Sequence, residues 1–181
     1  MSSNMKIRRV GINTFLLLFL ALHIAACKTD EEKKRDKELT SLQVCLAAEA
    51  PANDRGSAVA IGRTPLMYVK LEKSGFLDTG DILRARLVDN IDKVGGWAIA
   101  VQFDSHGTLL LDSMTSRYKG MHLAIMLGAK EERWVAAPLI NHRITNGYLV
   151  FTPEATREEA ERYVRGLNNI AKKIHKDDLV P

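Results

Sequence analysis

Residues 97–103 read WAIAVQF, an apolar run made of residues that favour strands. Gly95 and Gly96 break the chain before it, so the run predicts a central strand of a sheet. Either Asp104 or Ser105 then offers a side-chain oxygen that caps a helix. The expected helix has inward residues at about four-residue spacing, and Gly120 is placed to end it. These inward residues are Leu110, Met114 and Tyr118.

On the N-terminal side, the sequence predicts strands at 39–48 and 66–71, with a loop at 50–57 rich in turn-forming residues. Residues 78–81 read DTGD, whose side-chain oxygens suit the start of a helix and whose negative charge suits its dipole. We therefore expect a helix directly after this segment. It would carry Ile82, Leu83, Ala85, Arg86 and Leu87.

On the C-terminal side, buried strands are expected at 123–127 and 134–140, and Pro138 places the second at an edge or at its end. A turn at 145–147 precedes a short strand at 148–151. The last helix begins near Thr152 and Pro153 or at Thr156, which has Glu159 at capping-box spacing. Its inward stripe consists of Ala160, Tyr163, Val164, Leu167, Ile170 and Ile174.

These elements predict an α+β fold, a ferredoxin-like sandwich in which helices cover one face of a mixed sheet. Some 140 residues follow position 38, which is enough for one domain. We expect three parts: a signal segment at 1–26, a disordered, lipid-bearing tether at 27–38, and the α+β domain at 39–181.

The first residues have the pattern of a bacterial lipoprotein signal. Three basic residues, at positions 6, 8 and 9, precede an apolar core from Phe15 to Ile24, which is too short to span a bilayer. The core ends in Ile24-Ala25-Ala26-Cys27, which resembles the lipobox. Cleavage after Ala26 would expose Cys27 for lipidation and anchor the chain to a membrane. The alternative is an ordinary secretory signal with a chance cysteine.

Charge argues against a nucleic-acid partner. The chain has 26 Lys and Arg and 22 Asp and Glu, and three of the basic residues lie in the signal. The charges of both signs alternate, as at 31–38, so there is no clustered basic footprint. This mixed stretch lacks apolar residues and predicts a solvated tether. Lys28 follows the lipidated cysteine, at the position where an Asp usually signals retention of a lipoprotein in the inner membrane. Because Lys28 is not Asp, we expect the protein at the periplasmic face of the outer membrane.

Few residues are candidates for chemistry. Cys45 lies in a predicted strand, which indicates a buried, inert thiol, and no neighbouring base is identifiable. No two of the mature chain's histidines have the close spacing typical of a zinc site. Asp104, Ser105 and His106 are consecutive, so helix capping explains them better than a catalytic relay. We therefore expect no catalytic residue, no metal and no cofactor. The four histidines are His106, His122, His142 and His175, and Trp97 and Trp134 are expected to pack in the core or at an edge.

Between about residues 66 and 171 the sequence resembles the head subdomain of the first periplasmic domain of SecD and SecDF, membrane subunits that assist protein export. The resemblance lies in four pieces that occur in the same order. They are 77–82 with Ala85; 101–103 with Gly107; Thr115, Gly120 and 123–125; and 137–140, Ile144, Gly147, 151–152 and 159–160.

The resemblance implies the fold of the head and, at most, its contact with exported or surface polypeptides. Export subunits of this type couple transport to proton flow through membrane helices, and this sequence offers no such helix after its signal. It also departs from the family at 127–129, where an acidic residue is missing, and after Ile144, where only Gly147 remains of a glycine run.

Two classes of function follow. The first is a non-enzymatic, membrane-anchored export-accessory module whose partners are unfolded or exported polypeptides or envelope proteins. Such a domain would add a strand of its ligand to the edge at Pro138 or at 148–151, unless those edges are covered, for instance by the 39–48 strand. The alternative is a small envelope hydrolase built from scattered Asp, His and Ser side chains, which would need a cleft holding a His beside a carboxylate.

Overall fold

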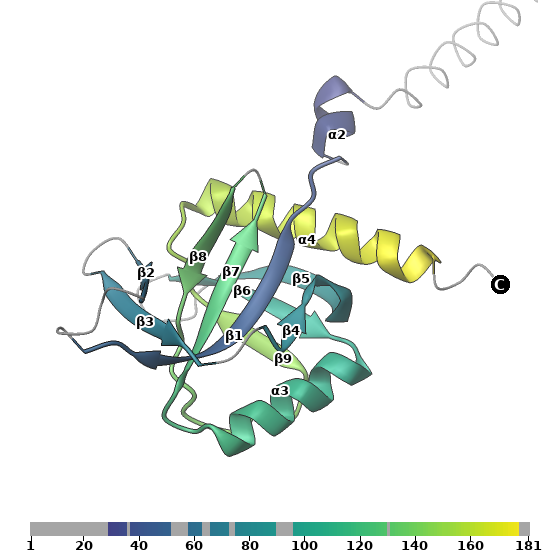
Figure 1. Ribbon diagram of the computed structural model, residues 1–181. Helices are drawn as coiled ribbons and strands as arrows, with labels where there is room; N and C mark the ends of the chain where they lie inside the picture. Colours follow the sequence, from purple (N-terminus) through teal and green to yellow (C-terminus); the bar gives the residue numbers. More distant parts are fainter. Residues whose placement is uncertain are drawn as a thin grey trace, which may run out of the picture. The chain divides into compact units, whose positions relative to one another are not determined.

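Two antiparallel sheets and two long helices make up the folded part of the chain (Figure 1). The computed structural model describes residues 29–35, 37–51, 58–62, 66–72, 75–89, 96–129 and 131–177. The elements are α2 (Asp30–Arg35), β1 (Ser41–Glu49), β2 (Val59–Ile61), β3 (Met67–Leu71), β4 (Leu77–Asp78), the 3-10 turn η1 (Thr79–Asp81), β5 (Ile82–Asp89), β6 (Trp97–Phe103), α3 (Ser105–Arg117), β7 (His122–Gly128), β8 (Glu132–Ala136), β9 (Tyr148–Phe151) and α4 (Arg157–Asp177). The described residues fall into two units, one that ends at Lys34 and one that begins at Arg35.

The larger sheet has the order β2-β3-β1-β7-β8, with β4 pairing to β1 beside β3. The smaller sheet has the order β5-β6-β9, so the predicted central strand at 97–103 is central. The α+β sandwich expected from the sequence is confirmed. The expected single mixed sheet is corrected, because the described strands form two sheets and every ladder between them is antiparallel.

The main core lies between the inner faces of the two sheets and extends to both long helices. Alternate residues of each strand point into it, as the two-residue period of a strand requires. Figure 1 shows α4 and α3 on opposite sides of the strands. Burial of each large side chain of this kind stabilises the fold by about 1.5–3 kcal/mol. Fully buried members include Val44, Leu46, Ile99, Leu111, Ile125, Leu149 and Leu167.

A second, smaller cluster lies on the outer face of the larger sheet. Cys45 and Ala47 of β1 point into it, while Val44 and Leu46 point into the main core. Strands β2 and β3 contribute Ile61 and Val69 to this cluster. Strand β1 is therefore buried on both faces, which explains why its sequence is a continuous apolar run rather than an alternating one.

The predicted helix at 82–87 is wrong, because these residues form strand β5. Asp78 does act as a cap, but the turn that it starts is the three-residue η1, which ends at once. From Arg84 onward the chain pairs with β6 residue by residue, and Ala85 points into the core while Arg84 and Arg86 point out. Tertiary pairing thus overrides a local helix-start signal.

The predicted starts of the two long helices are confirmed. The Asp104 side chain accepts a hydrogen bond from the Gly107 N–H at the start of α3. At the start of α4, Thr156 and Glu159 bond to each other's backbone N–H groups, the reciprocal pattern of a capping box. The buried face of α3 is shifted by one residue from the prediction. It consists of Gly107, Leu111 and Thr115, with Leu110, Met114 and Tyr118 partly buried beside it.

The expected disordered tether is corrected over residues 30–35, which form the short helix α2. The Thr29 hydroxyl accepts from the Glu32 N–H, and the Glu32 carboxylate accepts from the Thr29 N–H, so a capping box supplies the local order. Most of the predicted loop at 50–57, like the signal segment, lies outside the described residues. No helix in the described part of the chain has the length and apolar character needed to span a membrane.

Helix α4 closes the domain against its first residues. Arg165 pairs with Glu38 at 3.2 Å, and the Asn169 amide donates to the Glu38 carbonyl at 3.0 Å. Gly166 lies against Thr40, where a Cβ atom would meet the threonine hydroxyl and backbone. The helix therefore holds the entry to β1 in place through contacts that need a glycine at one position.

Candidate functional site

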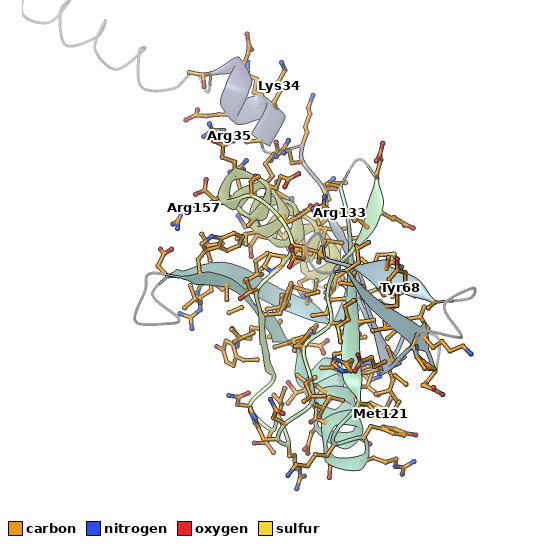
Figure 2. All side chains as sticks on the ribbon, turned by 90° about the vertical axis from the view of Figure 1, so that its left-hand side faces the viewer. Lys34, Arg35, Tyr68, Met121, Arg133 and Arg157 are labelled. Atoms are coloured by element: carbon orange, nitrogen blue, oxygen red, sulfur yellow. The ribbon has the colours of Figure 1, made fainter. Side chains whose placement is uncertain are left out.

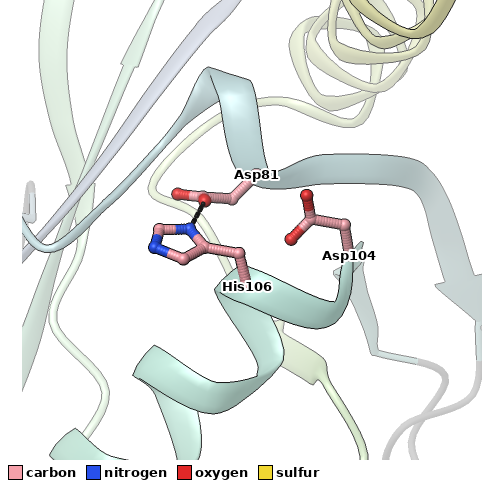
Figure 3. A group of neighbouring side chains, drawn as sticks. All are labelled: Asp81, Asp104 and His106. Atoms are coloured by element: carbon pink, nitrogen blue, oxygen red, sulfur yellow. Dashed lines mark hydrogen bonds and ion pairs between the residues drawn. The ribbon is translucent and has the colours of Figure 1, made fainter. Parts of the chain in front are cut away.

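Three side chains from separate segments meet at the start of α3. Asp81 ends η1, Asp104 precedes α3 and His106 lies in the first turn of that helix (Figure 3). One ligand atom from each lies within 4.8 Å of the others. The imidazole Nδ1 of His106 is 2.7 Å from Oδ1 of Asp81. Among the described residues, this is where His and carboxylate groups cluster in a number that could bind a metal ion.

Both carboxylates of this cluster accept hydrogen bonds from backbone N–H groups. Asp81 accepts from the Asp78 N–H at 3.0 Å, and its own carbonyl accepts from the Asp104 N–H at 2.8 Å. The Asp104 carboxylate accepts from the Gly107 N–H at 2.7 Å as the helix cap. The sequence predicted the capping role of Asp104. It did not predict the pairing of His106 with Asp81, because 25 positions separate them.

The electrostatics favour a protonated His106. The hydrogen bond to Asp81 raises the pKa of the imidazole, with charge attraction from the same carboxylate next and smaller effects from Asp104 and Asp78. The ring is 71% exposed, so solvent screens much of this attraction. Two hollows on the described residues, of about 480 and 330 Å³, have other linings. A histidine beside a carboxylate is thus present, as the hydrolase alternative requires, but it stands on an open surface.

The other three histidines lie apart from this cluster. The Nδ1 atom of His122 is 2.8 Å from the Ala137 carbonyl, and Nε2 of His175 is 2.9 Å from the Ile82 carbonyl. His142 is exposed in the segment before β9. The structure therefore brings no two of the four histidines into the group of potential ligands at Asp81.

Cys45 is buried, as the sequence predicted, with 2% of its surface exposed. Desolvation raises the pKa of its thiol, which disfavours the reactive thiolate. Trp97 packs against the main core and Trp134 against the smaller cluster, also as expected. Cys27 and Ala26, the predicted lipidation and cleavage residues, lie outside the described part of the chain.

The outer edge of β5 is covered by α4. The Asn168 side-chain amide accepts from the Ala85 N–H at 2.9 Å and donates to the Ala85 carbonyl at 2.8 Å. One amide thus replaces the two hydrogen bonds that a neighbouring strand would make. His175 adds its contact with the Ile82 carbonyl. The sequence does not predict this edge, because it predicts a helix for residues 82–87.

The edge at β8 is partly covered. The Val135 carbonyl accepts from the Glu154 N–H at 2.7 Å, and Nη2 of Arg133, labelled in Figure 2, donates to the Glu154 carbonyl at 2.9 Å. Strand β8 ends at Ala136, so Pro138 follows the strand end, as predicted. The segment after β9 therefore occupies part of this edge, and β1 lies in the interior of the sheet instead of covering it.

The outer edge of β9 has no strand partner among the described residues. The Phe103 N–H donates to the Gly147 carbonyl, so the alternation of an antiparallel ladder directs Leu149 and Phe151 toward β6. Tyr148 and Val150 then direct their backbone groups outward. The Asn146 side chain accepts from the Tyr148 N–H at 3.1 Å. Val150 keeps an outward N–H and carbonyl, and 50% of its surface is exposed.

A hollow of about 330 Å³, with both polar and apolar lining, includes the last residue of β9 in its wall. Phe151 and Thr152 form one wall, and residues 135–138 and Met67 form others. The described residues thus form an antiparallel α+β sandwich in which β9 pairs with β6 on one side and with no described strand on the other.

The family model of the SecDF P1 head subdomain matches residues 57–168. The chain belongs to this family, which confirms the resemblance stated from the sequence. A search of curated protein sequences finds no match.

Two solved structures share the fold. One is of SecDF, described as a membrane component that enhances protein export. It has 19% identity and a TM-score of 0.56, over 80% of this chain and 70% of that chain. The other is SecDF in a super-membrane-facing form, also with 19% identity and a TM-score of 0.56, over 78% of this chain and 21% of that chain. The present chain therefore spans about a fifth of that SecDF chain.

Proposed function

We propose that the chain is a membrane-anchored export-accessory protein that binds extended polypeptide at the outer edge of β9. The observation that carries this proposal is the outward N–H and carbonyl of the exposed Val150, on the side of β9 that no described strand pairs with. A bound chain would add a strand to the sheet, with affinity from backbone hydrogen bonds and limited specificity from side-chain pockets. Membership of the SecDF head family and the likeness to a component that enhances protein export support this role.

The test uses a reduced, unfolded model protein and its folded form as ligands for the full chain in mild detergent. The unfolded form should bind selectively. Val150→Pro should weaken that binding about tenfold, because proline removes the outward N–H while the ladder to β6 keeps its bonds. Val150→Thr keeps the N–H and is the matched control. Equal binding of the folded and unfolded forms, or equal affinity of the two variants, would exclude capture at this edge.

Anchoring by lipid at Cys27 is part of the same proposal. The lipobox at 24–27 supports it, and cleavage after Ala26 would leave the lipidated cysteine at the N-terminus. Cys27→Ser should abolish palmitate labelling and leave the chain unprocessed or released. Labelling that persists in this variant would contradict the anchor.

We further propose the periplasmic face of the outer membrane as the location, because Lys28 replaces the usual retention residue after the cysteine. The protein should co-fractionate with outer-membrane markers. A Lys28→Asp variant should move to the inner membrane. Fractionation of the wild type with the inner membrane, or a Lys28→Asp variant that fractionates as the wild type does, would argue against this location.

A further inference from the structure

The smaller sheet has one face in the core and one face directed outward. Ala85, Ile99 and Leu149 point into the core, so their neighbours along β5, β6 and β9 point away from it. Arg84, Arg86 and Val150 are exposed there. The outward residues of the three strands are Arg84, Arg86, Val88, Ala98, Ala100, Gln102, Tyr148 and Val150.

This outward face is hollowed along its middle strand. Ala100 pairs with Arg86 on one side and with Val150 on the other, so a methyl group stands between two longer side chains. Gln102 likewise lies between Arg84 and Tyr148. The result is a shallow hollow of about 130 Å³ lined by Arg84, Arg86, Ala100, Gln102 and Tyr148.

The charge of this hollow is uncompensated within the described residues. Arg84 and Arg86 stand on the same face of β5, roughly 7 Å apart along the strand. None of the outward residues of the three strands is acidic, and neither arginine has a hydrogen bond or ion pair to a described residue. Three other arginines of the domain have carboxylate partners within 3.5 Å: Arg143 with Asp112, Arg157 with Asp89 and Arg165 with Glu38.

We propose that this face docks an acidic, extended segment of a partner protein. Carboxylates of the segment pair with Arg84 and Arg86, whose planar guanidinium groups match a carboxylate with two parallel hydrogen bonds. A neighbouring side chain of the segment lies in the hollow, between the longer side chains that leave Ala100 only 2% exposed. The Gln102 amide and the Tyr148 hydroxyl can bond to polar groups of the segment. This docking is independent of strand addition at β9, which uses backbone groups of the edge.

The test measures binding of a labelled short peptide in which Glu alternates with Val, with a Gln-for-Glu peptide as its neutral counterpart. The full chain in mild detergent should bind the acidic peptide, and added salt should weaken the binding. The double variant R84Q/R86Q should weaken it about tenfold or more. The matched control is R117Q/K119Q, which removes two exposed charges at the end of α3 and should bind as the wild type does.

A third variant separates shape from charge. Ala100→Val narrows the hollow, keeps both arginines and suits a strand, so it should also weaken peptide binding. Circular dichroism and thermal unfolding verify that each variant is folded. Wild-type affinity in Ala100→Val would overturn the placement of the segment over the middle strand.

Three further outcomes would overturn the proposal. They are equal binding of the neutral peptide, equal losses in R84Q/R86Q and the control, and arginine-dependent binding to phosphatidylglycerol vesicles without peptide binding. The last would assign the face to a lipid surface. R84Q/R86Q should still bind an unfolded chain of low charge at β9, so failure here and failure of edge capture are distinguishable.

Discussion

The contact between His106 and Asp81 ties the first turn of α3 to the turn before β5. A pair in which the imidazole is largely exposed contributes modestly, but its contribution depends on pH. The histidine pKa in the folded protein is raised above the ordinary value of 6.5. The stabilisation is therefore fully present below that value and is lost as the pH rises through the folded pKa.

We predict that His106→Gln lowers the free energy of unfolding more at about pH 5.5 than at about pH 8.5. Urea denaturation at the two pH values measures this difference. Asp81 also accepts from the backbone, so a double-mutant cycle with Asp81→Asn isolates the pairwise energy. A coupling energy that is the same at both pH values would show that the imidazolium is not the stabilising species.

Gly107 is the residue that lets α3 approach β6 and η1. A Cβ atom at this position would lie 2.8 Å from Cβ of Asp81 and 2.9 Å from Cβ of Phe103. Gly107→Ala should therefore destabilise the fold by about 1–3 kcal/mol, despite the better helix propensity of alanine. Ser113→Ala, on the exposed side of the same helix, should change stability by less than about 0.5 kcal/mol. Equal stabilities of the two variants in urea would exclude the close contact.

At the scale of elements, most strands and both long helices could be predicted from local patterns. Capping residues, apolar runs and turn residues act over a few positions. They predict the helix starts at Asp104 and Thr156, and the capping hydrogen bonds confirm both. The failure at β5 has a physical cause. Residues 78–81 do form a capped turn, but it ends after three residues. The alternation of Arg84, Ala85 and Arg86 is a strand pattern, and it competes with the helix-start signal of that turn.

Contacts between distant elements could not be predicted in this way. The β5 edge is covered by Asn168, 83 positions away, and nothing in the local sequence of α4 distinguishes this asparagine from an exposed one. The pairing of Asp81 with His106 has the same character. The candidate site was therefore predicted in its parts, the cap and the short strand β9, but not in its arrangement.

Asn168 provides a test of how the smaller sheet ends. Asn168→Ala should destabilise the domain by about 1–3 kcal/mol, because the Ala85 N–H and carbonyl lose both partners. It should also increase self-association, since an uncovered edge pairs with other chains. Urea denaturation and sedimentation at several concentrations measure the two effects. Lys172→Ala, an exposed change one turn later, is the control, and equal behaviour of the variants would show that the edge is protected by other contacts.

At the scale of the whole molecule, Cys45 reports opening of the larger sheet. In a Cys27→Ser background it is the only thiol of the chain. Because it is buried and its pKa is raised, it should react with a thiol reagent at least about a hundredfold more slowly than a peptide thiol. Urea should remove the protection together with the fold. A native rate equal to that of a peptide thiol would show that the thiol is accessible in the folded sheet.

The contact of α4 with the entry to β1 has a consequence for the order in which the domain can form. Arg165 and Glu38 are 127 positions apart, and β1 also pairs with β7, far along the chain. The ribosome synthesises β1 before β7 and α4, so β1 cannot pair until those segments have been made. Contacts between residues so far apart in the sequence also form slowly. For the exported protein proposed above, this delay would keep the chain unfolded during its passage through a membrane, and the arrival of α4 would complete its folding.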